Sequence, residues 1–108
     1  MGGGSRVHVV VFREGDWWVG QCLEYDIATQ AKTLTDLHYE VGRLLVGHYA
    51  VAIERGWTPF ESVPPAPARH WRLFEEAKRL DLEPVPFRVH MSLPDAIPTP
   101  DLRLAEFV

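Results

Sequence analysis

The chain has 108 residues, of which 46% are hydrophobic, and a formal net charge of −4 at pH 7. This length fits one compact domain with an attached arm, and the apolar fraction supports a hydrophobic core and argues against disorder. The acidic balance disfavours a nucleic-acid footprint over the whole surface and suits a basic protein partner better. No apolar run is long enough to span a membrane and no charged-then-apolar leader is present, so we expect a cytoplasmic protein.

The first half of the chain predicts three strands. Residues 6–13 alternate so that both faces of the strand are largely apolar, which is typical of a central strand. A hairpin turn around Gly15, which is free to take a positive φ, leads into an antiparallel strand over residues 17–24. After a short break, residues 27–30 continue as a third strand.

One long helix is predicted over residues 34–55. Thr33 stands at its N-cap, where the hydroxyl can accept a first-turn N–H, and Asp36 brings negative charge to the positive helix end. Apolar residues follow at helical spacing, and Gly56 is a natural stop. Such a helix is about 30 Å long and can lie across the sheet.

Two glycines, Gly42 and Gly47, lie inside this helix although each costs about 1 kcal/mol relative to alanine. One interpretation is that the backbone packs closely on the sheet there. The other is a close helix–helix contact with another subunit. In the second case Leu102 and Leu104 would belong to the same oligomer contact, with the C-terminal tail exchanged between subunits.

All nine prolines lie after residue 58, which predicts irregular segments between short elements in the second half. We expect a spacer of polyproline character with Trp57 and Phe60 packed against the first half, then a helix, a strand and a tail that can pair with a sheet edge. The predicted organisation is a flexible lead-in (1–5), a β-β-β-α domain (6–56), a proline-rich linker (57–67) and a C-terminal extension (68–108) with helix 68–80, strand 87–93 and tail 101–108.

Two stretches of the first half carry a resemblance to a known family. Residues 22–27 (CLEYDI) loosely match a C-P-E-L-P-G-like turn, and residues 29–34 (TQAKTL) match a T-x-G-D-T that opens the helix. Over residues 7–56 the chain therefore resembles the HicB antitoxins of prokaryotes, which have a truncated RNase H-like fold. It departs from the pattern at Ala31-Lys32, where the family has Gly-Asp, and in the missing proline and glycine of the first turn.

The resemblance implies an α+β fold in which an antiparallel sheet of three to four strands packs against one long helix. It also implies a non-enzymatic antitoxin that masks a small basic HicA-like RNA-cleaving toxin, and opposite charges would speed their encounter. Because large aromatics carry much of the energy of an interface, the predicted partner contacts are exposed aromatics and acids, namely Trp17, Tyr25, Asp26, Trp57 and Phe60.

Two alternatives remain open. An orphan HicB-like domain would self-associate as a homodimer or a higher oligomer without a toxin. A metal-dependent nuclease remnant would use Glu24 and Asp26, together with Asp36 and Glu40, which are one helical turn apart. These acids also suit a turn and the start of a helix, where acidic residues have local roles.

The sequence predicts no catalytic residue, no metal site and no cofactor. The five histidines lack ligand spacing, and Cys22, the single cysteine, is typical of a small core residue. The second half has one predicted helix and many prolines, so no DNA-binding module of two helices joined by a short turn is predicted there.

Overall fold

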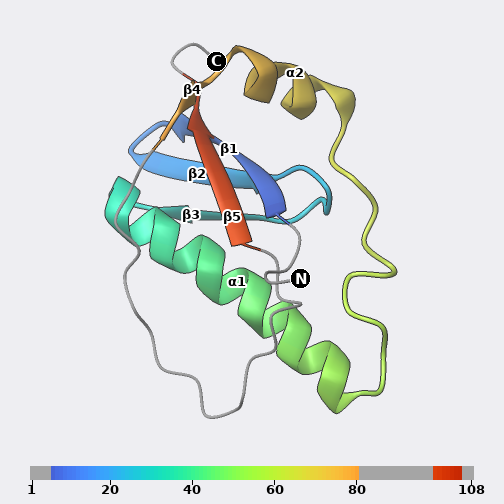
Figure 1. Cartoon of the computed structure of the whole chain (residues 1–108). Helices are drawn as coiled ribbons and strands as arrows, with labels where there is room; N and C mark the ends of the chain where they lie inside the picture. Colours follow the sequence, from blue (N-terminus) through green and yellow to red (C-terminus); the bar gives the residue numbers. More distant parts are fainter. Residues whose placement is uncertain (1–5, 81–98, 106–108) are drawn as a thin grey trace.

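A computed structural model describes residues 6–80 and 99–105. The chain order is β1 (Arg6–Glu14), β2 (Trp17–Cys22), β3 (Ala28–Ala31), α1 (Leu34–Glu54), α2 (Ala68–Glu76), β4 (Lys78–Arg79) and β5 (Thr99–Leu104). The predicted α+β class is confirmed (Figure 1). The lead-in (1–5), the predicted strand 87–93 and the end of the tail (106–108) lie outside the described residues.

The five strands form one mixed sheet in the order β3-β2-β1-β5-β4. β2 is antiparallel to both β1 and β3, as expected. β5 runs parallel to β1, with Leu102 opposite Val9, and β4 pairs antiparallel with β5. The sheet is therefore wider than the antiparallel sheet of three to four strands that was predicted. Its parallel pair joins residues from the two ends of the chain.

The central strand β1 is buried on both faces, as its sequence predicts. Val7, Val9 and Val11 are fully buried and pack, with Cys22 and Leu102, against one face of α1 that carries Leu37, Val41 and Leu45. Val10 and Phe12 point the other way and pack with Phe74 of α2. Because successive side chains of a strand alternate between faces, one apolar strand serves both layers, and the two helices lie on opposite sides of the sheet (Figure 1).

Local signals set the two ends of α1 as predicted. Thr33 has an extended backbone, and its hydroxyl accepts a hydrogen bond of 3.0 Å from the backbone N–H of Asp36. At the other end Arg55 is the C-cap, and Gly56 takes φ 70°, a left-handed conformation that glycine adopts without strain. Gly15 in the β1–β2 hairpin takes φ 61° for the same reason.

Close packing of the sheet on α1 occurs at Gly20 of β2. A Cβ there would lie 3.0 Å from Val41 Cγ2 and 3.4 Å from Leu37 Cδ1. By contrast, a Cβ at Gly47 of α1 would meet no described atom within 4 Å. The close contact that the sequence allowed at Gly47 is therefore absent from the described part of the chain.

The second helix is shorter than the predicted 68–80. Ala77 leaves the helix with φ −85° and ψ 155°, and Lys78 and Arg79 then pair with β5. The backbone N–H of Leu80 extends this pairing by donating to Leu102 O at 2.9 Å. The apolar pattern continues to Leu80, but the backbone of residues 78–80 pairs with the edge of β5 in place of the hydrogen bonds that another helical turn would have made.

Candidate interaction groove

The proline-rich segment after α1 is tied to the first half by backbone hydrogen bonds. Trp57 N donates to Ala52 O at 2.8 Å, Asp26 N donates to Pro64 O at 2.6 Å, and Ala66 N donates to Leu23 O at 2.8 Å. These bonds lie at both ends of the segment, so both ends are held against the surface of the domain. A segment held in this way can form a wall of a binding site.

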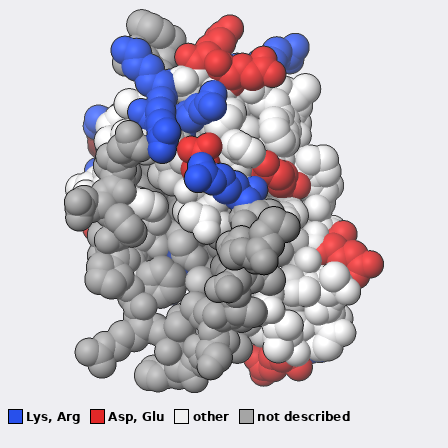
Figure 2. All heavy atoms as spheres, viewed as in Figure 1, with Lys and Arg blue, Asp and Glu red and all other residues white. Residues whose placement is uncertain are grey.

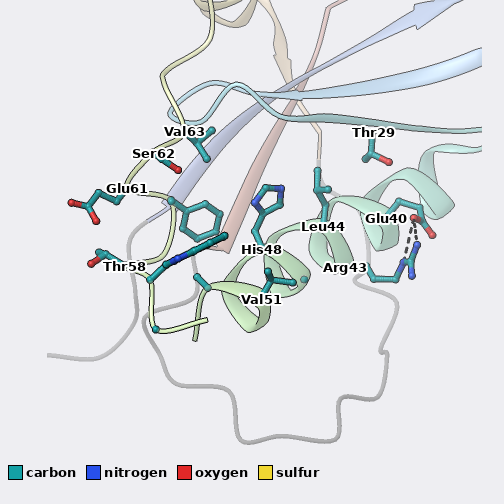
Figure 3. Close-up of a pocket in the computed structure, with 15 residues that line it drawn as sticks. Thr29, Glu40, Arg43, Leu44, His48, Val51, Thr58, Glu61, Ser62 and Val63 are labelled. Atoms are coloured by element: carbon teal, nitrogen blue, oxygen red, sulfur yellow. Dashed lines mark hydrogen bonds and ion pairs between the residues drawn. The ribbon is translucent and has the colours of Figure 1, made fainter. Parts of the chain in front are cut away.

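Between this segment and α1 lies a groove of about 1010 Å³. Figure 3 shows His48 and Val51 rising from α1 toward the groove, residues of the linker on the opposite side, and Thr29 of β3 above. Most of its lining is apolar, with hydroxyls and a few charged groups at the rim. The groove is lined by Thr29, Glu40, Arg43, Leu44, Gly47, His48, Val51, Ala52, Gly56, Trp57, Thr58, Phe60, Glu61, Ser62 and Val63.

An aromatic column supports the linker wall. The Phe60 ring stacks on Tyr25 at a centroid distance of 4.4 Å and an interplanar angle of 18°, and on His48 at 5.9 Å and 19°. Phe60 has φ 64°, the left-handed region that a bulky residue rarely adopts. Such strain costs about 1–3 kcal/mol and persists only where the surroundings impose it. The two stacking contacts and the linker hydrogen bonds impose it here.

Apolar surface is exposed at the groove. Val51 and Trp57, which line it, are 45% and 58% exposed. The sequence predicted that both Trp57 and Phe60 would pack against the first half. Phe60 does, but Trp57 stands mostly in solvent, with the Arg55 guanidinium 5.2 Å from its ring centroid.

Charges around the groove are few. Arg43 is paired with Glu40 at 3.3 Å at one end (dashed in Figure 3), and Glu61 is exposed at the other. In the view of Figure 2, Lys and Arg gather in the upper part of the molecule, toward β4 and α2. Asp and Glu stand among them there and also appear lower in the view. Because Arg43 lines the groove and Arg55 lies against Trp57, side chains of both charge signs border it.

Four of the five predicted partner contacts come together beside this groove. Phe60 and Trp57 line it, Tyr25 stacks on Phe60, and Asp26 is hydrogen-bonded to the linker through its backbone. Trp17 is separate, because it begins β2 whereas Tyr25 follows the other end of that strand. The Lys32 ammonium lies 4.2 Å from the centroid of the Trp17 ring.

The residues predicted as oligomer contacts lie in two places, on α1 and in the sheet. Gly47 lines the groove, and Gly42 lies half-buried on α1. Leu102 is 3% exposed in the core of its own sheet, and Leu104 packs half-buried against the same core. In this single chain the tail thus completes the sheet of its own subunit through β5.

Each acidic residue that the nuclease alternative would use either binds a nearby side chain or lies at the start of a helix. Glu24 binds His8, Asp26 Oδ1 accepts a 2.9 Å hydrogen bond from Gln21 Nε2, and Glu40 pairs with Arg43. Asp36 lies in the first turn of α1. Among the described residues, no three His, Cys, Asp or Glu side chains are placed to hold a metal ion.

His8, Glu24 and Asp101 form a polar cluster, not predicted from the sequence, on the α2 side of the sheet. His8 Nδ1 is 2.5 Å from Glu24 Oε2, and the backbone N–H of His8 donates to Glu24 Oε1 at 2.8 Å. His8 Nε2 faces Asp101 Oδ2 at 4.0 Å. The cluster ties β1 to β5 and to the turn after β2. The signal in the sequence was one polar residue within the apolar run of a central strand.

Comparison with known protein families, curated proteins and solved structures finds no match to this chain. In the described ranges, no helix has both the length and the apolar character needed to cross a membrane.

Proposed function

We propose that this chain is a non-enzymatic interaction protein of the HicB type, which binds and masks a small basic HicA-like RNA-cleaving toxin in the cytoplasm of a prokaryote. The observation that carries the proposal is the groove, where exposed Val51 and Trp57 adjoin the Tyr25–Phe60 stack. Apolar residues exposed together commonly mark a protein contact.

Two further features support the proposal. The order of three antiparallel strands followed by one long helix is the one that the resemblance to HicB antitoxins implies. The net charge of −4 favours a basic partner.

The test is an affinity pull-down from the lysate of the native cell, with mass spectrometry of the proteins that co-elute. We expect a small basic protein in stoichiometric amount. The variant Trp57→Ala should weaken its binding by about tenfold or more, because buried aromatic anchors dominate interface energies. The variant Ile53→Ala, at an exposed apolar residue of α1 that does not line the groove, is the matched control and should bind as the wild type does.

The recovered protein is then expressed alone and together with this chain. Alone it should arrest growth and degrade RNA, and co-expression should restore growth. Recovery of no basic protein, or of one without RNA-cleaving activity, would contradict the antitoxin proposal.

Self-association of an orphan HicB-like domain is the second candidate. The open backbone at Gly47 favours it, since a second helix could approach there. Recovery of the bait alone, as an oligomer in sedimentation experiments, would favour this candidate over the toxin.

A further inference from the structure

Residues 58–63 of the linker form a strap that is fixed to the rest of the domain at its two ends. Backbone hydrogen bonds of Trp57 on one side and of Pro64 on the other hold these ends. Within the described part of the chain, the backbone hydrogen bonds made inside the strap are two turns that join its own residues. The strap therefore spans the distance between two fixed points without a backbone bond to the described parts of α1 or the sheet.

One aromatic ring supplies the main contact between the strap and the domain. The structure describes all six strap residues, and none of them is buried and three are exposed. Phe60 is the strap residue that packs against the core, where its ring stacks on Tyr25 and on His48. Segments with few buried contacts and exposed backbone open locally at a lower free energy than the whole fold does.

The backbone of Phe60 opposes the position of this ring. Its φ of 64° is strained for a bulky residue, because the Cβ comes close to the following carbonyl oxygen. Among the described residues, Phe60 is the one residue other than glycine with a positive φ. The cost of such strain and the gain from a pair of stacked rings are similar in size. A small difference between the two therefore holds the strap in place.

We propose that the strap opens and closes as one unit, with Phe60 as its latch and with Trp57 and Pro64 as its fixed ends. In the closed state, which this structure shows, the strap forms the side of the groove opposite α1 (Figure 3). In the open state the ring of Phe60 leaves Tyr25 and His48, and this side of the groove is lost. The groove is therefore a gated site, and a molecule that contacts the strap wall shifts the population toward the closed state.

The first test is NMR relaxation dispersion of the backbone amides in the full-length, isotope-labelled protein without a partner. We expect the amides of residues 60–63 to share one exchange rate on the microsecond-to-millisecond timescale and one minor population of about 0.1–10%. The amides of β1 and of Ala66, whose N–H is bonded to Leu23 O, should show no exchange. This pattern would place the motion in the strap and outside the core.

Two variants test whether Phe60 is the latch. Phe60→Ala removes the ring and supplies the spectrum of the open strap. The shift differences that dispersion gives for residues 61–63 of the wild type should match those between the wild type and this variant. Tyr25→Ala leaves the strap sequence intact and should raise the open population about two- to tenfold, because one ring contact is lost. Trp17→Ala, at the other end of β2, is the matched control and should leave this population unchanged.

Cleavage after the exposed Glu61 by a glutamate-specific protease gives a second measurement of the open state. Mass spectrometry distinguishes this cut from cuts at other glutamates. When opening and closing are fast relative to cleavage, the rate follows the population of the open form. Tyr25→Ala should therefore raise the rate of cleavage after Glu61 by the same factor as it raises the open population, and Trp17→Ala should not change it.

The proposal has three outcomes that would overturn it. Flat dispersion at residues 60–63 would mean that the strap does not open on this timescale. Exchange at the same rate in Ala66 and β1 would mean that the whole domain opens. Equal open populations in the wild type and in Tyr25→Ala would mean that the Phe60 ring is not the latch. All of these measurements use the free chain, so the strap and the antitoxin proposal can each fail while the other stands.

Discussion

At the scale of single residues, Gly20 fixes how closely β2 approaches α1. In Gly20→Ala, the new methyl group would lie 3.0 Å from Val41 Cγ2. Val41 is fully buried, and a β-branched side chain in a helix has one strongly preferred rotamer, so it cannot turn away. We expect the free energy of unfolding, measured in urea, to fall by about 1–3 kcal/mol, the usual cost of overpacking. Gly47→Ala is the control that should not lose stability. A Gly20→Ala variant as stable as the wild type would show that the layers can separate.

Cys22 is a second residue whose environment decides its chemistry. Burial, with a smaller contribution from the nearby Glu24 carboxylate, raises the pKa of its thiol to about 12. Because the thiolate is the reactive form, the folded protein should react with a thiol reagent at pH 8 at least about a hundredfold more slowly than the protein in urea. Rates of labelling followed by mass spectrometry measure this. Labelling at the same rate in both states would place the thiol in solvent.

At the scale of elements, the Tyr25–Phe60 stack fastens the linker to the turn after β2. Tyr25→Ala and Phe60→Ala should each lower the free energy of unfolding. The double variant should lose less than the sum of the two, with a coupling of about 0.5–1.5 kcal/mol from the lost ring contact. Urea unfolding of the four proteins measures it. A parallel cycle with Trp17→Ala and Phe60→Ala, which are not in contact, should be additive. Additivity in the first cycle would mean that the stack does not hold the linker.

The elements also show which parts of the fold can be predicted from sequence. The cap at Thr33, the turn at Gly15 and the end of α1 at Gly56 were predictable, because each depends on residues a few positions apart. The end of α2 was not, since residues after Ala77 leave a helical pattern to pair with β5. The β1–β5 pairing joins Val9 to Leu102 across most of the chain, and no local pattern encodes it.

The candidate site was predictable in its residue types and not in its assembly. Tyr25, Trp57 and Phe60 were predicted as exposed aromatics that contact a partner, and the structure brings them to one region. Their meeting with His48 and Gly47 depends on the linker returning to hydrogen-bond near residue 26. That return is a tertiary contact, so the groove could not be derived from spacing along the chain.

At the scale of the whole molecule, both layers on the sheet depend on β1. Its α1 face carries Val7, Val9 and Val11 and its α2 face carries Val10 and Phe12, all of them buried. A substitution that disrupts β1 should therefore weaken the packing of both layers. The sheet should consequently unfold in one step with both helices, as small single domains generally do.

The stability of the whole molecule should also depend on pH through two histidines, one in each helix. Desolvation lowers the pKa of His38 in α1, and desolvation and then Arg69 lower that of His70 in α2, both from the usual 6.5. Their Nδ1 atoms are buried without a hydrogen-bond partner among the described residues. As the pH falls through 6.5, the unfolded chain takes up protons that the folded protein does not. The free energy of unfolding should therefore be greatest above pH 6.5 and fall as the solution is acidified below it.

Urea unfolding from pH 7.5 to pH 5 measures this. The double variant His38→Gln, His70→Gln should reduce the slope of the unfolding free energy against pH. If the double variant keeps the wild-type slope, other groups must bind the protons that acidification adds to the unfolded state.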